Sequence, residues 1–424
     1  MVIEKEMKLW FLLALLCYGF GNANGRSLAD LETFNVINFG ARADGVTDNS
    51  QAFLAAWKAA CTSTGAVNLV IPSGTYFLNP VQFRGPCKNV QSLTVQMQGT
   101  LKASTDLNQY ATARVWVEFG WVDHLTLTGG GTFDGQGEVT WPLNTCPRDQ
   151  NCKIPPTSLM FVNMNNTIVN HIKSVNSKFF HIGVLGCQNF QGSRIQITAP
   201  AESPNTDGIH LERNSGVTIS DSEIATGDDC VSVGQGNSLV TLNGIRCGPG
   251  HGISVGSLGK YQNEKDVRGL IVRDCSLTET DNGIRIKTWA NSPTSSVCAN
   301  MTFENIVMNN VANPIIIDQS YCPYANCMSS ASSKVKISDI HFRNITGTSK
   351  TPVAVTLKCS QRVPCEKVSL QDVDLTFTGQ NSTSATCLNV KADYSGTQNP
   401  LPASNKLLRT KDQIVVILLP QSAV

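Results

Sequence analysis

The sequence predicts an all-β protein, namely a single-domain right-handed parallel β-helix with a short N-terminal capping helix. The main evidence is a repeat of four similar segments, spaced by 22, 22 and 31 residues, that begin at Asp207, Asp229, His251 and Asn282. Each segment has a polar lead residue followed by alternating apolar positions. A recurring unit of this length is typical of solenoids, in which each coil packs only on its neighbours.

Two apolar columns run through these four segments. Because side chains alternate between the two faces of a strand, the positions two and four places after each lead residue share one face, which we expect to be buried. The positions between them are polar or small, as in His210 and Arg285, and we expect them to face outward. The apolar columns are Ile209, Val231, Ile253 and Ile284, and then Leu211, Val233, Val255 and Ile286.

Short apolar runs between these segments predict a second set of strands. The runs begin at Val217, Val240, Leu270, Met301 and Val335, and Asp, Asn, Ser or Gly residues that favour turns follow each of them. Two or three short strands per coil, stacked in register, make a parallel β-helix. A β-sandwich or a propeller is the alternative, but these folds predict strands about every 8–12 residues or blades of about 40–45 residues.

The N-terminal segment is typical of a signal peptide. Charged residues precede the apolar run Trp10–Phe20, which is shorter than the roughly 20 residues that span a bilayer, and small residues follow it. A membrane anchor is therefore the weaker alternative. We expect a signal peptide over residues 1–23, a β-helix domain over 24–402 and an atypical tail over 403–424.

The first part of the mature chain predicts a helix that covers one end of the solenoid. Asp48 or Asn49 precedes a segment from Ser50 to Cys61 with apolar residues on one face, namely Phe53, Leu54, Trp57 and Ala60. Early strands are expected over Asn68–Phe77 and Leu93–Leu101. The glycine-rich segment that follows predicts tight turns, with Asp134 and Gln136 near the rim of a groove.

Composition limits the classes of partner and ligand. The net charge of +1 gives no basic face of the kind that nucleic-acid binding requires. The 15 cysteines in a chain with a secretory signal favour disulfides over zinc, for which paired Cys-x2-Cys clusters are missing. The expected pairs are Cys61–Cys87, Cys146–Cys152, Cys230–Cys247, Cys322–Cys327 and Cys359–Cys365. Four Asn-x-Ser/Thr sequons, at Asn165, Asn300, Asn344 and Asn381, fit a secreted glycoprotein.

Three aspartates form the candidate catalytic group. Asp207 and Asp229 lead successive coils, so their backbones are expected about 4.8 Å apart. Asp228 joins them on one groove only if the chain bends, which Gly227 permits. Carboxylates this close cannot all ionise freely, so at least one should have a raised pKa. The plainer interpretation is that these are turn aspartates that bind backbone N–H groups.

A histidine and two cations extend the group. His251 lies one coil beyond Asp229, where it can orient a carboxylate, although an ordinary turn histidine is the alternative. Arg285 and Lys287 are two residues apart, so both reach the outward face and suit an anionic ligand. A solvated surface pair is the alternative, but Arg285 continues the outward column of the acidic segments.

The four motifs that carry these residues resemble the signature of the polygalacturonases, the family 28 glycoside hydrolases. The motifs are Asn205-Thr-Asp207, Gly227-Asp-Asp229, Gly250-His-Gly252 and Arg285-Ile-Lys287. The similarity extends from about Phe34 to Pro402, and the detail around the motifs is most similar to plant pollen exopolygalacturonases.

The resemblance implies hydrolysis of α-1,4-galacturonan with inversion, without a metal or other cofactor, by a monomer secreted to the cell wall. It assigns protonation of the leaving oxygen to Asp228 and activation of water to Asp207 and Asp229. It also implies that His251 tunes the acid. The expected substrate-binding residues are Asn205, Arg285, Lys287 and Tyr321.

One departure from the family lies near the C-terminus. The family usually places a cysteine after the segment Gly396–Pro402, where it pairs with the residue at Cys387, but Ala403 follows here and the tail has no cysteine. Cys387 is therefore expected to be unpaired. An endo-acting enzyme, a non-catalytic pectin-binding wall protein and, more distantly, a calcium-dependent pectate lyase are the alternatives to exo-acting hydrolysis.

Overall fold

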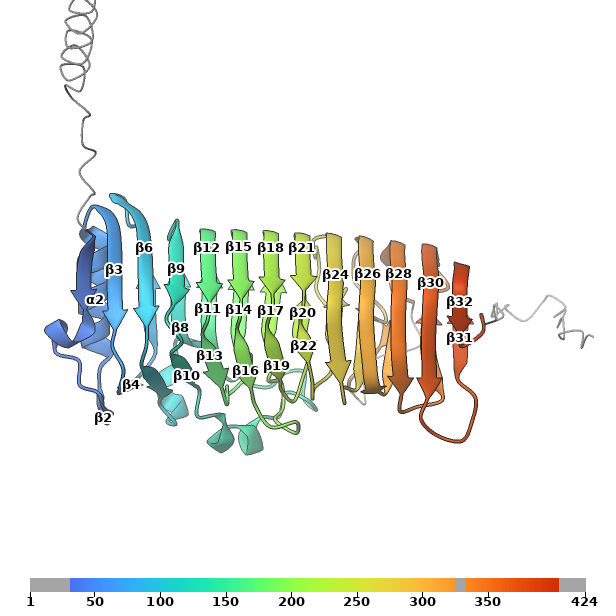
Figure 1. Ribbon diagram of the computed structural model, residues 1–424, viewed down its shortest axis with the longest axis horizontal. Coiled ribbons are helices and arrows are strands. Elements are labelled where there is room, and N and C mark those ends of the chain that lie inside the picture. The colour runs from blue at the N-terminus through green and yellow to red at the C-terminus, as the bar shows by residue number, and fades with distance from the viewer. Residues whose placement is uncertain (1–30, 325–331, 404–424) are drawn as a thin grey trace, which may run out of the picture.

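The structure is a parallel β-helix, which confirms the predicted fold. The computed structural model describes residues 31–324 and 332–403, so the expected signal peptide and nearly all of the C-terminal tail lie outside the described residues. Coils stack side by side along the long axis, from the N-terminal helix at one end to the strand β32 (Val390–Asn399) at the other (Figure 1). No helix among the described residues is both long and apolar enough to cross a membrane.

The lead segments form one parallel sheet of 11 strands. Ile209 pairs with Val231, Val231 with Ile253 and Ile253 with Ile284, which is the predicted register. In order along the sheet, the strands are β5 (Val81–Arg84), β8 (Val115–Gly120), β11 (Thr157–Val162), β14 (Ile182–Leu185), β17 (Ile209–Glu212), β20 (Val231–Val233), β23 (Ile253–Leu258), β25 (Asn282–Trp289), β27 (Asn313–Tyr321), β29 (Val353–Lys358) and β31 (Ser384–Leu388).

The remaining strands form a second parallel sheet of 21 strands. They are β1 (Glu32–Asn35), β2 (Asp44–Asp48), β3 (Gly65–Ile71), β4 (Thr75–Leu78), β6 (Val90–Met97), β7 (Thr100–Ala103), β9 (Leu125–Thr128), β10 (Thr132–Asp134), β12 (Asn165–Asn170), β13 (Lys173–Val175), β15 (Gln188–Ser193), β16 (Gln196–Thr198), β18 (Ser215–Ser220), β19 (Glu223–Ala225), β21 (Ser238–Asn243), β22 (Arg246–Cys247), β24 (Val267–Thr278), β26 (Ser296–Val311), β28 (Val335–Ser349), β30 (Cys365–Phe377) and β32.

The predicted second column is correct for four of its five strands. Val217, Val240, Leu270 and Met301 lie in register on neighbouring coils. The fifth run also begins a strand, as predicted, but outside this register, because Met301 pairs with Ile340, whereas Val335 pairs with Ser296 at the start of β28. The long strand β28 carries two similar apolar pairs, and the sequence pattern alone does not say which of them continues the column.

The early strands are shorter than expected. The predicted strand over residues 68–77 is divided into β3 and β4, and the one over residues 93–101 is divided into β6 and β7. Gly74 separates the first pair with a positive φ of 139°, which favours glycine. Each coil therefore turns a corner where the sequence pattern indicates a continuous strand.

A helix covers the N-terminal end, as predicted. The helix α2 (Ser50–Thr62) buries Phe53, Ala56, Trp57 and Ala60, whereas Leu54 is only half-buried. Its N-cap is Asn49, although the carboxylate that accepts from the N–H of Ser50 belongs to Asp48. The short 3₁₀ helices are η1 (Val36–Phe39), η2 (Leu107–Tyr110), η3 (Gly137–Val139) and η4 (Trp141–Leu143).

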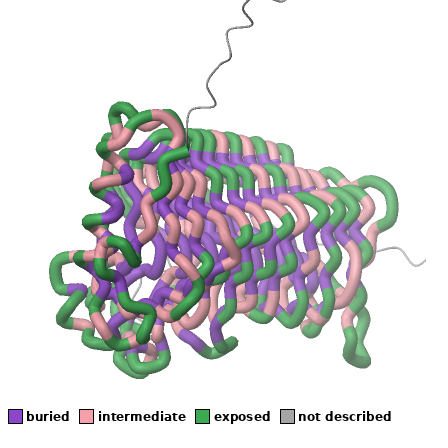
Figure 2. The backbone as a smooth tube through the Cα atoms, turned by 60° about the vertical axis from the view of Figure 1, so that its left-hand side comes forward, coloured by how far each residue is buried: buried purple, intermediate pink, exposed green. Residues whose placement is uncertain are grey.

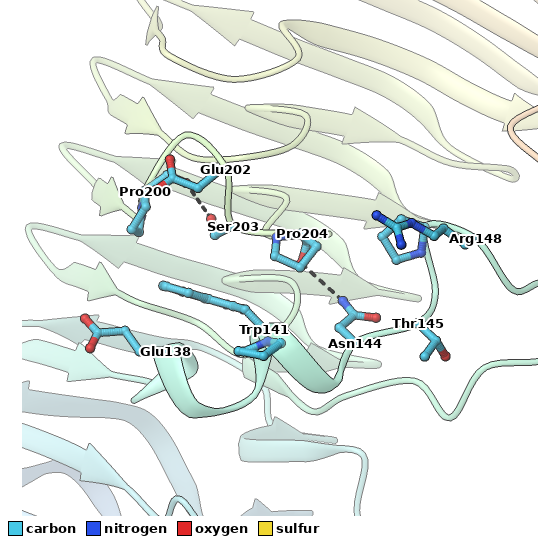
Figure 3. Close-up of a pocket in the computed structure, with 11 residues that line it drawn as sticks. Glu138, Trp141, Asn144, Thr145, Arg148, Pro200, Glu202, Ser203 and Pro204 are labelled. Atoms are coloured by element: carbon cyan, nitrogen blue, oxygen red, sulfur yellow. Dashed lines mark hydrogen bonds between the residues drawn. The ribbon is translucent and has the colours of Figure 1, made fainter.

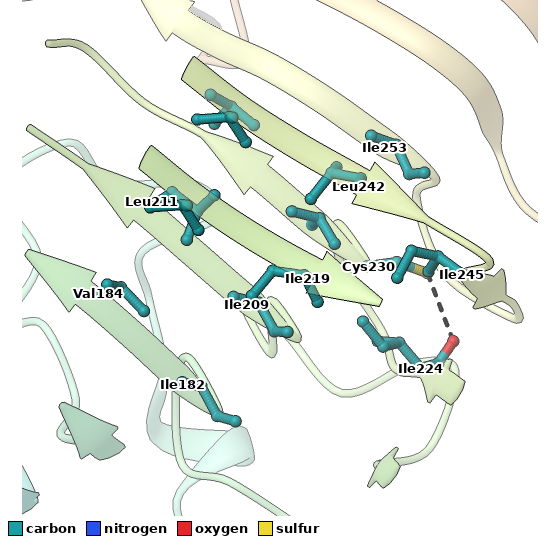
Figure 4. Close-up of a cluster of buried hydrophobic side chains, with 14 of the residues drawn as sticks. Ile182, Val184, Ile209, Leu211, Ile219, Ile224, Cys230, Leu242, Ile245 and Ile253 are labelled. Atoms are coloured by element: carbon teal, nitrogen blue, oxygen red, sulfur yellow. Dashed lines mark hydrogen bonds between the residues drawn. The ribbon is translucent and has the colours of Figure 1, made fainter. Parts of the chain in front are cut away.

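The core is the continuous interior of the coil stack. Both predicted apolar columns are buried there, including Ile209, Leu211 and Ile253 (Figure 4), and buried segments follow the inner side of successive coils (Figure 2). Hydrogen bonds between buried amides hold one corner of the coils, because Asn237 Oδ1 accepts from Asn214 Nδ2 at 3.0 Å and Asn214 Oδ1 accepts from the N–H of Cys187 at 2.8 Å.

Four of the five predicted disulfides are present: Cys61–Cys87, Cys146–Cys152, Cys230–Cys247 and Cys359–Cys365. The fifth involves Cys327, which lies outside the described residues. Cys387 is a buried free cysteine, as expected, and so are three cysteines for which the sequence suggested no partner, Cys187, Cys275 and Cys298. All four sequon asparagines are exposed.

Candidate active site

The three aspartates meet where consecutive coils enter the 11-stranded sheet. The N–H of Gly208 donates to the carbonyl of Asp229 at 2.9 Å, so Asp207 and Asp229 lie on neighbouring coils. The predicted bend occurs at Gly227, where a Cβ would lie 2.0 Å from the carbonyl oxygen of Ser203. Because only glycine tolerates this approach, the chain can turn here and bring Asp228 to the same side as Asp229.

Asp228 is held by hydrogen bonds to both of its oxygens. Oδ1 accepts from the N–H of Asp229 and lies 2.8 Å from His251 Nδ1, and Oδ2 accepts from Asn205 Nδ2 at 3.3 Å. Burial alone would raise the pKa of Asp228, but the contact and charge of His251 outweigh it and the pKa is lowered. Burial alone would lower the pKa of His251, but its contact with Asp228 outweighs burial and the pKa of His251 is raised.

Asp229 forms a buried ion pair with Lys287. The Lys287 ammonium lies 2.7 Å from Asp229 Oδ2, and Ser254 Oγ donates to Asp229 Oδ1 at 2.6 Å. The two side chains are 9% and 2% exposed. Burial alone would lower the pKa of Lys287, but the charge of Asp229 raises it. Lys287 therefore reaches back across coils to the acids, where its ammonium contacts Asp229 directly.

Asp207 is the carboxyl group with a raised pKa that the sequence predicts. Burial is the main cause, and the charges of Asp228 and Asp229 add to it. Lys287 opposes the shift without cancelling it. In the free protein, Asp207 is thus the carboxyl group that retains a proton most strongly.

Three outward residues that the sequence analysis treated only as surface positions belong to the site. Ser254 donates to Asp229, Ser232 lowers the pKa of Asp207, and His210 Nδ1 lies 2.8 Å from Ser232 Oγ. Although this column was predicted to face outward from the core, Ser232, Ser254 and Lys287 are buried, because they lie against the acids. Their position in the same outward column as Arg285 is the feature of the sequence that indicates that they belong to the site.

Arg285 lies beside the acids with its charge available. Its Cζ atom is 5.1 Å from the ring centroid of Tyr321, and Lys287 Nζ is 5.6 Å from the same ring. Among the ion pairs of the described residues, Lys287 has a carboxylate partner and Arg285 has none. A guanidinium on an aromatic face, without a carboxylate partner, is suited to an acidic ligand.

The acids and His251 also have the composition of a metal site. One ligand atom each from Asp228, Asp229 and His251 lies within 4.8 Å of the others. However, His251 Nδ1 already contacts Asp228, and the Lys287 ammonium occupies an oxygen of Asp229. These contacts favour a hydrogen-bonded network over a cation site, and the absence of a metal stays a prediction.

A cavity of about 730 Å³ lies next to this group, between the segment Glu138–Arg148 and the loop Pro200–Pro204 (Figure 3). Asn144 Nδ2 donates to Asn205 Oδ1 at 3.2 Å, and Asn205 in turn donates to Asp228. The cavity is therefore connected to the acids through one residue. Asp134 and Gln136, expected near a groove rim, hydrogen-bond to each other at 2.7 Å rather than to the acids.

The chain belongs to a known class of enzyme. Residues 61–397 match the model of the glycosyl hydrolases family 28, so the chain is a member of that family.

Particular relatives narrow this class. An exopolygalacturonase of Zea mays is 43% identical over 93% of this chain and 97% of its own length. An exopolygalacturonase of Platanus acerifolia is 45% identical over 87% of this chain and 96% of its own. Among solved structures, an endo-xylogalacturonan hydrolase from Aspergillus tubingensis matches with a TM-score of 0.73 at 23% identity, covering 86% of this chain and all of that one, which is a likeness of fold.

Proposed function

We propose that this protein is a secreted exo-acting polygalacturonase that hydrolyses the α-1,4-galacturonosyl linkages of pectin in the cell wall. The observation that carries the proposal is the meeting of three aspartates and a histidine with a guanidinium that has no carboxylate partner. Glycoside hydrolysis needs a proton donor beside an ionised carboxylate. An acidic sugar also needs a cation beside the scissile bond, which Arg285 supplies.

In this proposal Asp228 protonates the leaving oxygen, and Asp207 and Asp229 activate water. The pKa directions place the retained proton of the free protein on Asp207 instead. In a coupled group of carboxylates the protons belong to the group rather than to one residue. Substrate that displaces the charge of His251 from Asp228 would return the proton to Asp228.

The roles of Asp228 and Asp207 can be separated with a substrate whose leaving group needs no proton. We expect Asp228→Asn to lose about 10²–10⁴ of kcat on polygalacturonate and to recover much of it on an aryl galacturonide with an acidic phenol. Asp207→Asn, in contrast, should stay inactive on both substrates. Recovery by Asp207→Asn alone would transfer the acid role to Asp207.

We propose inversion at the anomeric carbon because of the family resemblance, and not because of the distance between the carboxyl groups. A carboxylate oxygen of Asp228 lies within 4.8 Å of a carboxylate oxygen of Asp229. This distance is less than the roughly 6.5–9.5 Å between the carboxyl groups of inverting glycosidases. The distance therefore does not support inversion, and the proposal of inversion rests on the resemblance of the motifs. Proton NMR of the first product tests it, since a β-anomer is expected and an α-anomer would indicate retention.

Exo action is supported by the relatives and by the loop that carries Asn144. This loop hydrogen-bonds Pro204 and Asn205, directly beside Asp228, and in this proposal it closes the groove to an uncut chain. Chromatography of polygalacturonate digests decides between the two modes. Galacturonate monomer throughout the time course, with slow loss of viscosity, is the expected result, and a rapid fall in viscosity would establish endo action.

Two further assays address the remaining alternatives. A pectin-binding wall protein without activity would show no difference between the wild type and Asp228→Asn in product release. A pectate lyase would form an unsaturated product that absorbs in the ultraviolet and would stop in a chelator. We expect hydrolysis to continue in a chelator without any rise in that absorbance.

A further inference from the structure

A second cation rests on an aromatic ring close to Arg285. Lys260 Nζ lies 5.3 Å from the ring centroid of Trp289 and 5.3 Å from that of Tyr261. Trp289 packs edge-on against Tyr321, with ring centroids 5.6 Å apart, and Tyr321 is the ring below Arg285. The two cation–aromatic pairs therefore form one continuous surface.

This surface continues the outer face of the 11-stranded sheet. Trp289 ends β25 and pairs with Tyr321 at the end of β27, whereas Lys260 follows the end of β23. Because alternate side chains of a strand share a face, Trp289 projects to the same side of β25 as Arg285 and Lys287. The surface thus extends the site from the acids along the strand edge.

The loop that carries Lys260 is fixed in place. The carboxylate of Glu264 accepts from the backbone N–H groups of Gly259, Lys260 and Tyr261 at 2.6, 2.8 and 2.8 Å. Gly259 has a φ of 80°, and a Cβ there would lie 2.8 Å from the side chain of Ser292. Glu264 is therefore engaged by the backbone and leaves the ammonium of Lys260 unneutralised.

The same surface contains donors that lack acceptors. Arg285 Nε and Trp289 Nε1 are buried and have no hydrogen-bond partner among the described residues. A buried donor without a partner is costly, so such groups usually have a functional explanation. In addition, Lys260 has no carboxylate within ion-pair distance in the part of the chain that the structure describes, so this surface holds two cations without anions.

We propose that Lys260 and Trp289 form a second uronate-binding subsite, next to the one at Arg285 and Tyr321. The ligand is a further acidic sugar unit of the same chain, with its carboxylate on Lys260 and its ring against Trp289. This inference rests on the proposed function, because it assumes an acidic 1,4-linked oligosaccharide at the acids. A chain of two units spans the scissile bond, with one unit at the acids and one at Arg285, so only a third unit reaches Lys260 and a chain of three units binds more tightly than a chain of two.

Calorimetric titration of the full-length Asp228→Asn protein with digalacturonate and trigalacturonate tests the subsite. Lys260→Met should weaken trigalacturonate binding by about threefold to tenfold, as expected for loss of one partly buried charge contact, and leave digalacturonate binding unchanged. Lys265→Met, which removes an exposed lysine five residues away, should alter neither. Unchanged trigalacturonate binding, or an equal loss with both ligands, would overturn the subsite.

Trp289→Phe provides a second variant that keeps a ring at this position. It should weaken trigalacturonate binding less than Trp289→Ala does, and a larger loss with Phe would also contradict the stacking. The wild type is assayed separately for release of galacturonate. If the wild type hydrolyses polygalacturonate but trigalacturonate binds no more tightly than digalacturonate, only the subsite is overturned. If trigalacturonate binds more tightly but no galacturonate is released, only the proposed function is overturned.

Discussion

At the scale of single residues, the three carboxyl groups have different neighbours. Asp229 faces the ammonium of Lys287, Asp228 faces His251, and Asp207 has no cation in direct contact within the described residues. Burial therefore dominates at Asp207 and raises its pKa. One small volume thus contains a carboxyl group whose pKa burial raises, Asp207, and one whose pKa the contact with His251 lowers, Asp228.

Asp207→Asn should abolish activity and yet stabilise the protein at neutral pH. Between the ordinary carboxyl pKa of 3.8 and the raised pKa of the folded state, the folded protein keeps a proton that the unfolded chain releases, so the free energy of unfolding falls as pH rises. Asparagine does not titrate and removes this loss.

Thermal unfolding of the wild type and of Asp207→Asn from pH 3.5 to 7 measures the effect. The advantage of the variant in melting temperature should grow with pH through this range. Asp123→Asn, at an exposed position, is the matched control for the change from aspartate to asparagine. A constant difference for Asp207→Asn would contradict the raised pKa.

Lys287→Met should lower the free energy of unfolding by about 3–5 kcal/mol, because it leaves the buried carboxylate of Asp229 without its partner. Urea unfolding at pH 7 measures the loss. The double variant Lys287→Met, Asp229→Asn should be more stable than Lys287→Met alone, since Asp229 no longer leaves a buried charge without its partner. A double variant that is less stable than the single one would show that packing, rather than charge, dominates.

At the scale of elements, the disulfide Cys230–Cys247 supports the site directly. Cys230 follows Asp229 and precedes β20, and the bond closes a loop of 17 residues. A loop of this size contributes about 3 kcal/mol by restricting the unfolded chain. Replacing both cysteines with alanine should therefore lower stability by about that amount and also reduce kcat, because Asp228 and Asp229 lose their fixed flank.

Cys359–Cys365 provides the matched control for this prediction. It closes a loop of 6 residues and lies several coils beyond the acids. Its removal should cost less stability and should leave kcat unchanged. Equal losses of kcat for the two pairs would indicate a general loss of folded protein, which circular dichroism would detect.

At the scale of the whole molecule, the helix α2 protects the first coils. Trp57 is 4% exposed, packs on Phe83 and Phe119, and donates through Nε1 to the carbonyl of Arg84 at 3.1 Å. Trp57→Ala should lower the free energy of unfolding by about 3–5 kcal/mol and leave kcat at 25 °C unchanged, because the acids lie several coils away. Trp121→Ala, at a side chain that is 44% exposed, should cost much less in denaturant unfolding.

The sequence predicts the coil register and the residues of the site because both follow from the repeat. Ile209, Val231, Ile253 and Ile284 occupy one column, and that column places Asp207, Asp229 and His251 on successive coils. The contacts that decide protonation do not follow from the repeat. Lys287 reaches Asp229 across coils, and Ser232 and Ser254 turn toward the acids, which requires side-chain conformations that spacing does not encode.

The position of Val335 shows a second limit. A long strand offers two apolar pairs to its neighbour, and packing against Met301 selects Ile340. Similarly, the cavity beside Trp141 depends on how two loops far apart in sequence approach each other, which no periodic pattern describes.

The regular stacking also has an evolutionary consequence. The acids, the histidine and both cations come from four adjacent coils, and neighbouring coils repeat the same backbone pairing. Duplicating or deleting one complete coil near either end would lengthen or shorten the molecule without changing any distance inside that block. Enzymes built this way can acquire longer or shorter grooves for new polymers while they inherit the reacting groups intact.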